Sequence, residues 1–223
     1  MSLLVKSPET AEGQQALKLL RKRRDRYMFS LFLLLVLGFT ALAFTTGLIP
    51  SSSMEPGLIP GDHILIERTW AAYPFGVLPQ RGDIITFRFT KEAQKRSDIS
   101  ANSPVEDKPA KDQILIKRVI GLPGDTVQLK GNDLYINGGR IKETYPISRI
   151  PANDLPLDTP YATLTPLKID AGRLFVLGDN RGNSDDGRYW GTLAITDVTG
   201  KYIRTLYHTN PPSPQQIQKR AGN

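Results

Sequence analysis

The sequence predicts a mostly β protein, in which an antiparallel β-sheet domain follows one transmembrane helix. The helix is predicted from residues 27–48, which are 22 consecutive positions without a charged side chain. As a helix this stretch is about 33 Å long, close to the thickness of the hydrocarbon layer of a bilayer. The β domain is predicted because no long stretch with 3.6-residue apolar periodicity follows Pro50, whereas short β-branched and apolar runs recur.

The composition excludes several kinds of site. The 223 residues include no Cys and two His, which excludes disulfides, thiolate metal sites, a cysteine nucleophile and a three-histidine metal site. Charged residues make up 23% and hydrophobic residues 39%, which is typical of a globular protein and not of a disordered one. The net charge of +7 is compatible with binding to nucleic acid, with binding to anionic lipid or with no specific partner. The location of the basic residues in the sequence distinguishes these three possibilities.

Much of this positive charge lies before the apolar stretch. Residues 1–26 hold seven basic and three acidic residues, concentrated in the sequence RKRRDR, and the next basic residue is Arg68. The positive-inside rule therefore predicts a cytoplasmic segment at 1–26, a transmembrane helix at 27–49 and an exported domain beyond. The basic cluster then sets orientation, and no nucleic-acid partner is expected.

Two other interpretations of the apolar stretch are a buried core helix and a cleaved signal peptide. The adjacent arginines argue against a core helix. Ala41-Leu42-Ala43 has the small-x-small form of a cleavage site. However, the apolar run continues to Ile49 and exceeds the usual apolar region of about 7–15 residues in a signal peptide. An uncleaved anchor is therefore predicted.

The strands of the exported domain are introduced by Gly-Asp turns. Gly61-Asp62, Gly82-Asp83 and Gly124-Asp125 each precede an apolar, β-branched run. Glycine supplies a positive φ and aspartate can bond its own local backbone, so each pair predicts a turn that opens a strand. The sequence TVQLK, then LYI, then Asn-Gly-Gly at 137–139, then RIKE predicts a meander with a tight hairpin. We expect an antiparallel β domain at 50–207.

Three segments are expected to lie outside the sheets. Residues 91–113 are polar, charged and without apolar periodicity, and are expected to form a flexible surface insertion, as are parts of 144–160. Residues 208–223, with PPSPQQIQKRAGN at the end, are expected to form a disordered tail.

A serine-rich segment follows the predicted membrane span. Pro50–Leu58 reads PSSSMEPGL. Three serines by themselves are typical of a polar linker. A nucleophile at this position would instead be held at the bilayer surface. The Ser-x-x-Lys arrangement of penicillin-binding proteins is absent, because Met-Glu-Pro follows Ser53.

The second segment, ILIKRVIGLPGD at 114–125, places two cations in an apolar strand. Lys117 shares a face with Leu115 and Val119, and Arg118 occupies the opposite face. The structural interpretation is that one of the two cations reaches water at a sheet edge. The functional interpretation is that Lys117 is desolvated, which lowers the pKa of its ammonium group and allows it to act as a general base toward a serine.

The third segment, GDNRGNSDDGRYWG at 178–191, is dense in Asp, Asn and Gly. Calcium binding is disfavoured, because Arg181 stands where an EF-hand loop needs a ligand two residues after Asp179. A tight loop with Asp–Arg pairs and a packed Trp is the better physical interpretation. No metal site and no cofactor are predicted.

Taken together, these segments and RGDIITF at 81–87 resemble the type I (leader) signal peptidases, which are membrane serine proteases with a Ser–Lys dyad. The four stretches have the family's order, and the anchor lies directly before the serine. The resemblance implies a mostly β fold of antiparallel sheets. It also implies a role for nine residues: Ser53 as nucleophile, Lys117 as general base, Ser51 and the Ser53 N–H as oxyanion donors, Ser184 as the residue that orients the lysine, and Asp179, Asn180, Arg181, Asp186 and Arg188 as residues that shape the site.

The sequence departs from the family's pattern at four positions. Ser52 stands where Gly is usual, and Gly57 where Thr is usual. Gly182 and Gly187 stand where Asp and Ser are usual. No member of the dyad is affected, but the last two departures put in doubt how closely the loop keeps the family's hydrogen bonds.

The resemblance implies that the substrates are exported preproteins with small residues, typically Ala, at the third and first places before the cut. The expected location is a plasma or thylakoid-type membrane near the secretion translocon. The peptide is expected to lie extended beside the strands near the dyad. Apolar surface around Ile49, Leu58 and Ile59 is expected to enter the lipid headgroups.

Two other functional classes are compatible with parts of the sequence. One is a membrane-tethered β module that only binds, with Ser53 in a linker. A penem-like acylating probe would distinguish this class by forming no Ser53-dependent adduct. The other is a soluble Ser–Lys protease of the self-cleaving repressor kind. The apolar span argues against that class, and carbonate-resistant membrane association would exclude it.

Overall fold

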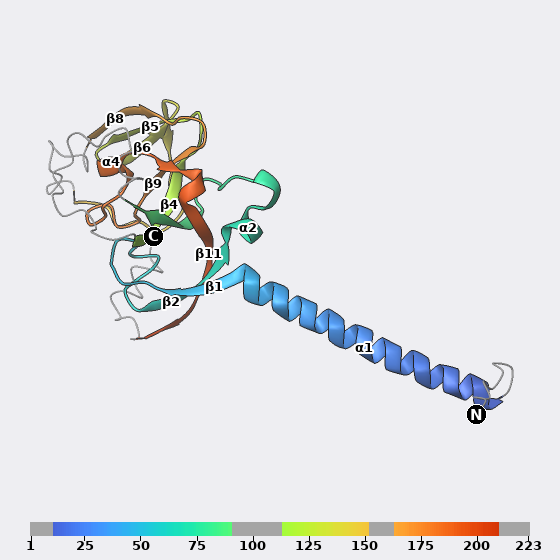
Figure 1. Ribbon diagram of the computed structural model, residues 1–223. Helices are drawn as coiled ribbons and strands as arrows, with labels where there is room; N and C mark the ends of the chain where they lie inside the picture. The colour runs from blue at the N-terminus through green and yellow to red at the C-terminus, as the bar shows by residue number, and fades with distance from the viewer. Residues whose placement is uncertain (1–10, 91–112, 152–162, 210–223) are drawn as a thin grey trace. The chain divides into compact units, whose positions relative to one another are not determined.

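The computed structural model describes residues 11–90, 113–151 and 163–209 (Figure 1). It divides into a helical unit ending at Ala43 and a β unit beginning at Phe44. Helix α1, Ala11–Ala43, makes up the described part of the first unit. Its portion Gly13–Ala43 is long and apolar enough to cross a membrane, and large apolar side chains such as Phe32 and Leu34 are about two-thirds exposed. An apolar helix that is exposed in this way is typical of membrane association.

The helix is shorter at its C-terminal end than the sequence predicts. Residues 44–49, which we assigned to the span, are not helical, and Phe44–Leu48 forms strand β1. This strand pairs antiparallel with β2, Asp62–Arg68, from Phe44 opposite Glu67 to Leu48 opposite His63. The residues Thr-Thr-Gly in β1 favour a strand over a helix, because β-branched residues and glycine both weaken helices. The β unit therefore begins six residues before the predicted position.

The β unit contains two antiparallel sheets, which confirms the predicted fold class. The larger sheet has the strand order β1-β2-β11-β3-β4-β9-β10 and the smaller has the order β7-β6-β5-β8. The remaining strands of the larger sheet are β3 Ile84–Phe89, β4 Gln113–Gly121, β9 Arg173–Leu177, β10 Leu193–Ala194 and β11 Val198–His208. The smaller sheet contains β5 Thr126–Lys130, β6 Asp133–Ile136, β7 Gly139–Ile141 and β8 Thr163–Lys168.

Short helices connect some of these strands. They are α2 Thr69–Ala72, the 3₁₀ turn η1 Pro74–Gly76, α4 Gly187–Trp190 and the 3₁₀ turn η3 Ile195–Asp197. Helix α4 begins after Asp186, whose carboxylate accepts the backbone N–H of Arg188 and so caps the helix.

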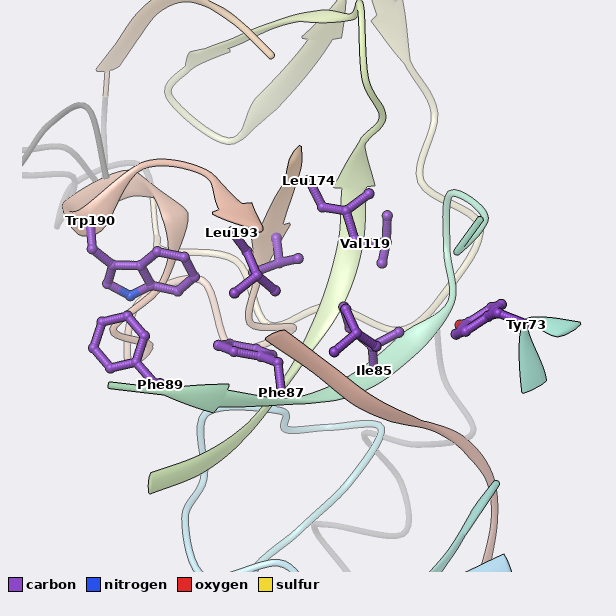
Figure 2. Packing of buried hydrophobic residues seen from close by; sticks show 10 residues of the cluster. Tyr73, Ile85, Phe87, Phe89, Val119, Leu174, Trp190 and Leu193 are labelled. Atoms are coloured by element: carbon purple, nitrogen blue, oxygen red, sulfur yellow. The ribbon is translucent and has the colours of Figure 1, made fainter. Parts of the chain in front are cut away.

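The buried apolar residues form three clusters among the described residues, and one of them joins the smaller sheet to β4 and β9 of the larger sheet. Another cluster joins Phe87 and Phe89 of β3 to Trp190 of α4, with ring centroids 5.9 and 5.2 Å apart, as Figure 2 shows. Such tilted aromatic pairs add to the stabilisation from burial alone. This packing holds α4, and with it the end of the 178–191 loop, against β3. The predicted packing of Trp190 beneath the loop is confirmed.

The three Gly-Asp turns share one geometry. Gly61, Gly82 and Gly124 have φ angles of 91°, 92° and 89°, in the left-handed region that favours glycine. In each turn the aspartate accepts the backbone N–H of the residue three positions earlier, from Ile59, Gln80 and Leu122 at 2.7–3.1 Å. The predicted hairpin between β6 and β7 also forms, with Asn137 and Gly138 at positive φ. These turns confirm the strand starts that the sequence predicts.

Several predicted irregular segments are partly ordered. Gln113 begins β4, and 91–112 lies outside the described residues. Within 144–160, Ile147 and Ile150 are buried, whereas 152–162 lies outside the described residues. His208 ends β11, and its imidazole lies against the buried carboxylate of Asp62, so the ordered chain extends past the predicted start of the tail. Residues 210–223 lie outside the described residues.

Candidate active site

The serine-rich segment forms a loop between β1 and β2 that is closed at its base. Ile49 donates its N–H to the Asp62 carbonyl, and Gly61 donates to the Ile49 carbonyl, both at 2.9 Å. Met54 and Leu58 are fully buried and pack with isoleucines of β2 and β3. The apolar residues therefore anchor the loop, which is an ordered element and not a linker.

The same burial corrects the expected lipid contact. Ile49, Leu58 and Ile59 are 3%, 1% and 2% exposed, so these side chains belong to the protein core and cannot enter the headgroups. They were expected to be exposed because apolar residues next to a membrane span resemble an interfacial patch in sequence. The closed loop turns them inward instead.

Strand β4 brings Lys117 to Ser53 across 64 residues of sequence. The Nζ of Lys117 lies 2.8 Å from Ser53 Oγ, and it also donates to the Ile116 carbonyl at 3.1 Å. Lys117 is 4% exposed and Arg118 is 8% exposed. The interpretation in which one of these two cations reaches water is therefore wrong, because both are buried.

Burial lowers the pKa of the Lys117 ammonium group, since desolvation disfavours the charged form. The carboxylates of Asp186, Asp185 and Asp179 oppose this effect, in decreasing order, and Arg188 adds to it. Desolvation is the larger influence. The geometry places this amine, whose pKa burial lowers, within hydrogen-bond distance of a serine hydroxyl.

A cleft of about 310 Å³ opens over this pair. Ser51 contributes to it, with its Oγ 3.4 Å from Ser53 Oγ. The other lining residues are Ser52, Ser53, Phe89, Gln113, Leu115, Lys117, Asn183 and Asp185. The nucleophile candidate and the lysine are thus accessible from a cavity that a peptide backbone could enter.

The 178–191 loop supports the backbone of the serine loop. Asn180 donates its N–H to the Ser53 carbonyl and its side-chain amide to the Ser52 carbonyl, both at 3.1 Å. A Cβ added to Gly178 would lie 2.5 Å from the Ser53 carbonyl oxygen. Only glycine allows this close approach, so Gly178 lets the two loops pack together.

The charged residues of this loop form three buried ion pairs. Asp179 accepts two hydrogen bonds from Arg118, at 2.6 and 2.7 Å, and Asp186 accepts two from Arg188, each at 2.8 Å. Arg181 pairs with Glu143 through both guanidinium Nη atoms. These pairs confirm the Asp–Arg interpretation of the loop and hold it rigid.

The ion pairs differ in their effect on the carboxylates. Burial favours the neutral form of Asp186, but Arg188 and the Gly178 N–H outweigh it and lower the pKa of the carboxyl group. Burial is the larger effect at Asp179 and raises its pKa, although Arg118 opposes this. Partial burial and the neighbouring Asp186 raise the pKa of Asp185.

Ser184 lies beside this network but does not contact Lys117 through a hydrogen bond. It is 3% exposed, and its hydroxyl acts on the Asp186 carboxylate and helps to lower the pKa of that group. A Cβ at Gly178 would overlap this side chain, which places Ser184 against the start of the loop. Its role in orienting Lys117 remains a prediction.

Sequence reasoning missed four contributors to the site. Arg118 and Glu143 were not assigned roles, because their partners Asp179 and Arg181 lie 61 and 38 residues away. Asn183 donates to Ser52 Oγ at 2.9 Å, so the serine that replaces the family's usual glycine gains a hydrogen bond of its own. Asp185 lines the cleft and acts electrostatically on Lys117. In the sequence, the role of Asp185 is indicated only by its position between Ser184 and Asp186.

Among the residues that the structure describes, no group of three or more His, Asp or Glu is arranged to hold a metal ion. In the 178–191 loop, the carboxylates of Asp179 and Asp186 are instead directed to arginines.

Comparison with known proteins decides the family. The sequence profile of the family described as "Signal peptidase, peptidase S26" matches residues 24–207. The chain belongs to the signal peptidase family, peptidase S26. A relative described as "Signal peptidase I" from Leptolyngbya laminosa is 36% identical over 180 residues, covering 81% of this chain and 77% of that protein. Another, "Thylakoidal processing peptidase 1, chloroplastic" from Arabidopsis thaliana, is 30% identical and covers 74% and 42%.

A solved structure is also similar. The crystal structure of a signal peptidase I from Enterococcus faecalis aligns with a TM-score of 0.41 at 33% identity, covering 56% of this chain and 97% of that one. The membership in this family confirms the resemblance stated from the sequence. The protein is therefore a peptidase of a serine protease family that processes the signal peptides of preproteins.

Proposed function

We propose that this signal peptidase cleaves with a Ser53–Lys117 dyad. The observation that carries the proposal is the 2.8 Å distance between Lys117 Nζ and Ser53 Oγ, made by a lysine that is 4% exposed. A lysine buried in this way is neutral at lower pH than an exposed one, so it can accept a proton from the serine. A lysine base needs no further residue to fix a tautomer.

In the proposed acylation step, the Lys117 amine takes the hydroxyl proton of Ser53 while Oγ attacks the scissile carbonyl carbon. The Ser53 N–H and the Ser51 hydroxyl donate to the developing oxyanion, where each donor is typically worth about 3 kcal/mol. The tetrahedral intermediate then expels the amine of the mature protein, which takes the proton from the Lys117 ammonium group. Ser53 is left as an ester of the signal peptide.

In the proposed deacylation step, Lys117 deprotonates a water molecule that attacks the ester carbonyl, and Ser53 Oγ recovers the proton. Ser184 is proposed to orient Lys117, because it is the serine at the position that has this role in the family and its side chain is buried, as is that of Lys117. Asp179, Asn180, Arg181, Asp186 and Arg188 are proposed to shape the site through the contacts described above.

An apolar groove supports the proposed mode of substrate binding. It has a volume of about 410 Å³ and is lined by five strands: Thr45–Leu48 of β1, Ile64 and Ile66 of β2, Thr86 of β3, Ile114–Ile116 of β4 and Thr199 of β11. Since β1 and β4 are separated by three strands in the sheet order, their common groove requires the sheet to curl.

Both borders of this groove offer backbone groups. β4 pairs with β9 only from Arg118 onward, and β1 pairs with β2 alone among the described strands. An extended peptide could therefore add as a strand between them. In such a peptide the first and third side chains before the cut point to the same face, which matches a small-x-small (Ala-x-Ala) requirement.

The proposed topology follows from the charge pattern. Residues 1–26 remain in the cytoplasm, α1 spans the plasma or a thylakoid-type membrane, and the β unit lies outside, near the translocon that delivers preproteins. The basic residues before the apolar stretch support this orientation.

The test is cleavage of a detergent-solubilised preprotein with an Ala-x-Ala site. Ser53→Ala and Lys117→Ala should each abolish cleavage, while Ser52→Ala, a neighbouring serine without an assigned catalytic role, should retain it. EDTA should leave the wild-type rate unchanged. Retained activity in Ser53→Ala or Lys117→Ala would contradict the dyad.

A further inference from the structure

The first five residues of β4 have different surroundings on their two faces. Residues 113–117 precede the part of β4 that pairs with β9, so they pair with β3 alone among the described strands. Alternate side chains of a strand point to opposite faces. Ile114 and Ile116 line the apolar groove, whereas Gln113 and Lys117 line the cleft over the proposed dyad. The groove and the cleft therefore lie on opposite faces of this strand edge.

The register of β3 leads to the same assignment. Phe89 lies opposite Gln113 and lines the cleft, and Thr86 lies opposite Ile116 and lines the groove. Residues directly opposite each other in an antiparallel pair have their side chains on the same face. Leu115 borders both the groove and the cleft. Two strands thus agree on which face is turned to the groove and which to the cleft.

The groove and the cleft also differ in chemistry. The described residues that line the groove are mostly isoleucines and threonines and include no carboxylate. The described residues that line the cleft include the carboxylate of Asp185 and the side-chain amides of Gln113 and Asn183. The groove suits the methyl groups of two alanines, and the cleft suits a polar side chain.

Asp185 differs from the other two carboxylates of the 178–191 loop. Asp179 and Asp186 accept hydrogen bonds from arginines, whereas Asp185 accepts none from the described residues. Its side chain is accessible to solvent and lines the cleft. Desolvation and the charge of Asp186 raise the pKa of Asp185, because both disfavour the ionised form. A cation that enters the cleft would favour that form.

We propose that Asp185 selects preproteins with a basic side chain at the second place before the cut, which is the middle residue of the small-x-small site. The proposal rests on the proposed function, in which the peptide adds to the edge of β4. When its first and third side chains enter the groove, the second side chain points to the cleft. A lysine or arginine at this place brings its cation to Asp185. Lys117 is the other charged residue among the described lining of the cleft, and it acts as a neutral amine in the proposed mechanism, so it does not repel that cation.

The test is a competition among three preproteins that differ only in the middle residue of the site, which is Ala-Lys-Ala, Ala-Gln-Ala or Ala-Glu-Ala. The full-length enzyme in detergent cleaves the mixture, and the relative rates give ratios of kcat/KM. We expect the wild type to favour the Lys site over the Glu site by about fivefold or more, with the Gln site between them. Asp185→Asn should bring the ratio close to one, and Asp185→Lys should invert it. Equal cleavage by the wild type, or an unchanged ratio in Asp185→Asn, would overturn the proposal.

Two controls sharpen this test. A ratio measured within one enzyme is independent of the effect of Asp185 on the pKa of Lys117, because that pKa enters kcat/KM equally for the three substrates. Asp133→Asn removes the same charge from an exposed pair with Arg140 outside the cleft, and should keep the wild-type ratio. An equal loss of preference in Asp133→Asn would overturn the proposal. So would a larger preference when Lys, Gln and Glu are placed directly after the cut.

Failure of this proposal and failure of the proposed function give different results. Equal cleavage of the three sites, by an enzyme that requires Ser53 and Lys117, would refute the selectivity of Asp185 alone. Continued cleavage by Ser53→Ala would refute the dyad, whatever the ratio among the three sites.

Discussion

Two adjacent cations on strand β4 have different surroundings and are expected to have different roles. Lys117 and Arg118 are both buried and point to opposite faces. Arg118 donates to both oxygens of Asp179 and to the Gly82 carbonyl, and its guanidinium also stacks over Tyr145 at 4.1 Å. Lys117 contacts only the Ser53 hydroxyl and a backbone carbonyl, and no carboxylate of the described residues forms an ion pair with it.

The difference shows how a counter-ion determines whether a buried cation keeps its proton. Arginine remains charged in proteins, so Arg118 needs Asp179 and serves as a fixed structural link. A lysine without an ion-pair partner can lose its proton instead, and at Lys117 desolvation lowers the pKa more than the nearby carboxylates raise it. One cation is therefore expected to be essential for stability and the other for activity.

The largest expected effect is on activity when Lys117 is replaced. Lys117→Met keeps much of the volume and removes the amine, so preprotein cleavage should fall by about 10³-fold or more. Thermal or chemical unfolding should show a stability within about 1 kcal/mol of the wild type or higher, because a desolvated amine is replaced by an apolar side chain. A variant that loses activity only because it unfolds would contradict this assignment.

The next effect is on stability when Arg118 is replaced. Arg118→Met leaves the fully buried Asp179 carboxylate without its cation, which is expected to lower the free energy of unfolding by about 3–5 kcal/mol. Urea denaturation of the β unit measures this loss. The control is Arg140→Met, whose partner Asp133 lies at an exposed site, where the expected loss is below about 1 kcal/mol. Equal losses in the two variants would contradict the expectation that the buried Arg118–Asp179 pair matters more for stability than the exposed Arg140–Asp133 pair.

A smaller effect is expected on the pH dependence of kcat/KM when Asp185 is replaced by a neutral residue. The Asp185 carboxylate raises the pKa of Lys117, after the larger influence of Asp186. Asp185→Asn removes one negative charge, so the pKa of Lys117 should fall further and the rise of kcat/KM should move to lower pH. A shift to higher pH, or no shift, would show that Asp185 does not act on Lys117.

The smallest effect concerns the hydrogen bond between Asn183 and Ser52. Asn183→Ala removes one donor from a partly exposed contact, which is expected to cost about 0.5–1.5 kcal/mol of unfolding free energy. Ser52→Gly should have a comparable effect, and the double variant should cost little more than either single variant. Fully additive losses would mean that the two side chains do not stabilise each other.

The parts of the fold that depend on local chemistry could be predicted from the sequence. The Gly-Asp turns at Gly61, Gly82 and Gly124 were predicted because the positive φ and the aspartate bond are both local requirements. The dyad residues were identified through a family resemblance, and the fold brings them together. Their burial could not be read from the strand pattern, since both faces of β4 are apolar.

The parts that depend on distant partners could not be predicted. The sequence predicts too late an end for α1, because Phe44–Leu48 carries no charge and continues the uncharged stretch, and its pairing with β2 involves residues 15 to 23 positions away. The pairing of Arg181 with Glu143 crosses 38 residues, so neither side chain reveals the other in sequence. The burial of Ile49, Leu58 and Ile59 likewise depends on how the serine loop closes.

The central claim is that a neutral, buried Lys117 activates Ser53, and the pH dependence of kcat/KM for an Ala-x-Ala preprotein tests it most directly. The acid limb of this profile reports the free enzyme's essential base. The account predicts a rise governed by one group whose pKa lies below that of an ordinary lysine, about 10.4, with no activity at any pH in Lys117→Met. A rise at the pKa of an ordinary lysine, or the same profile in Lys117→Met, would contradict it.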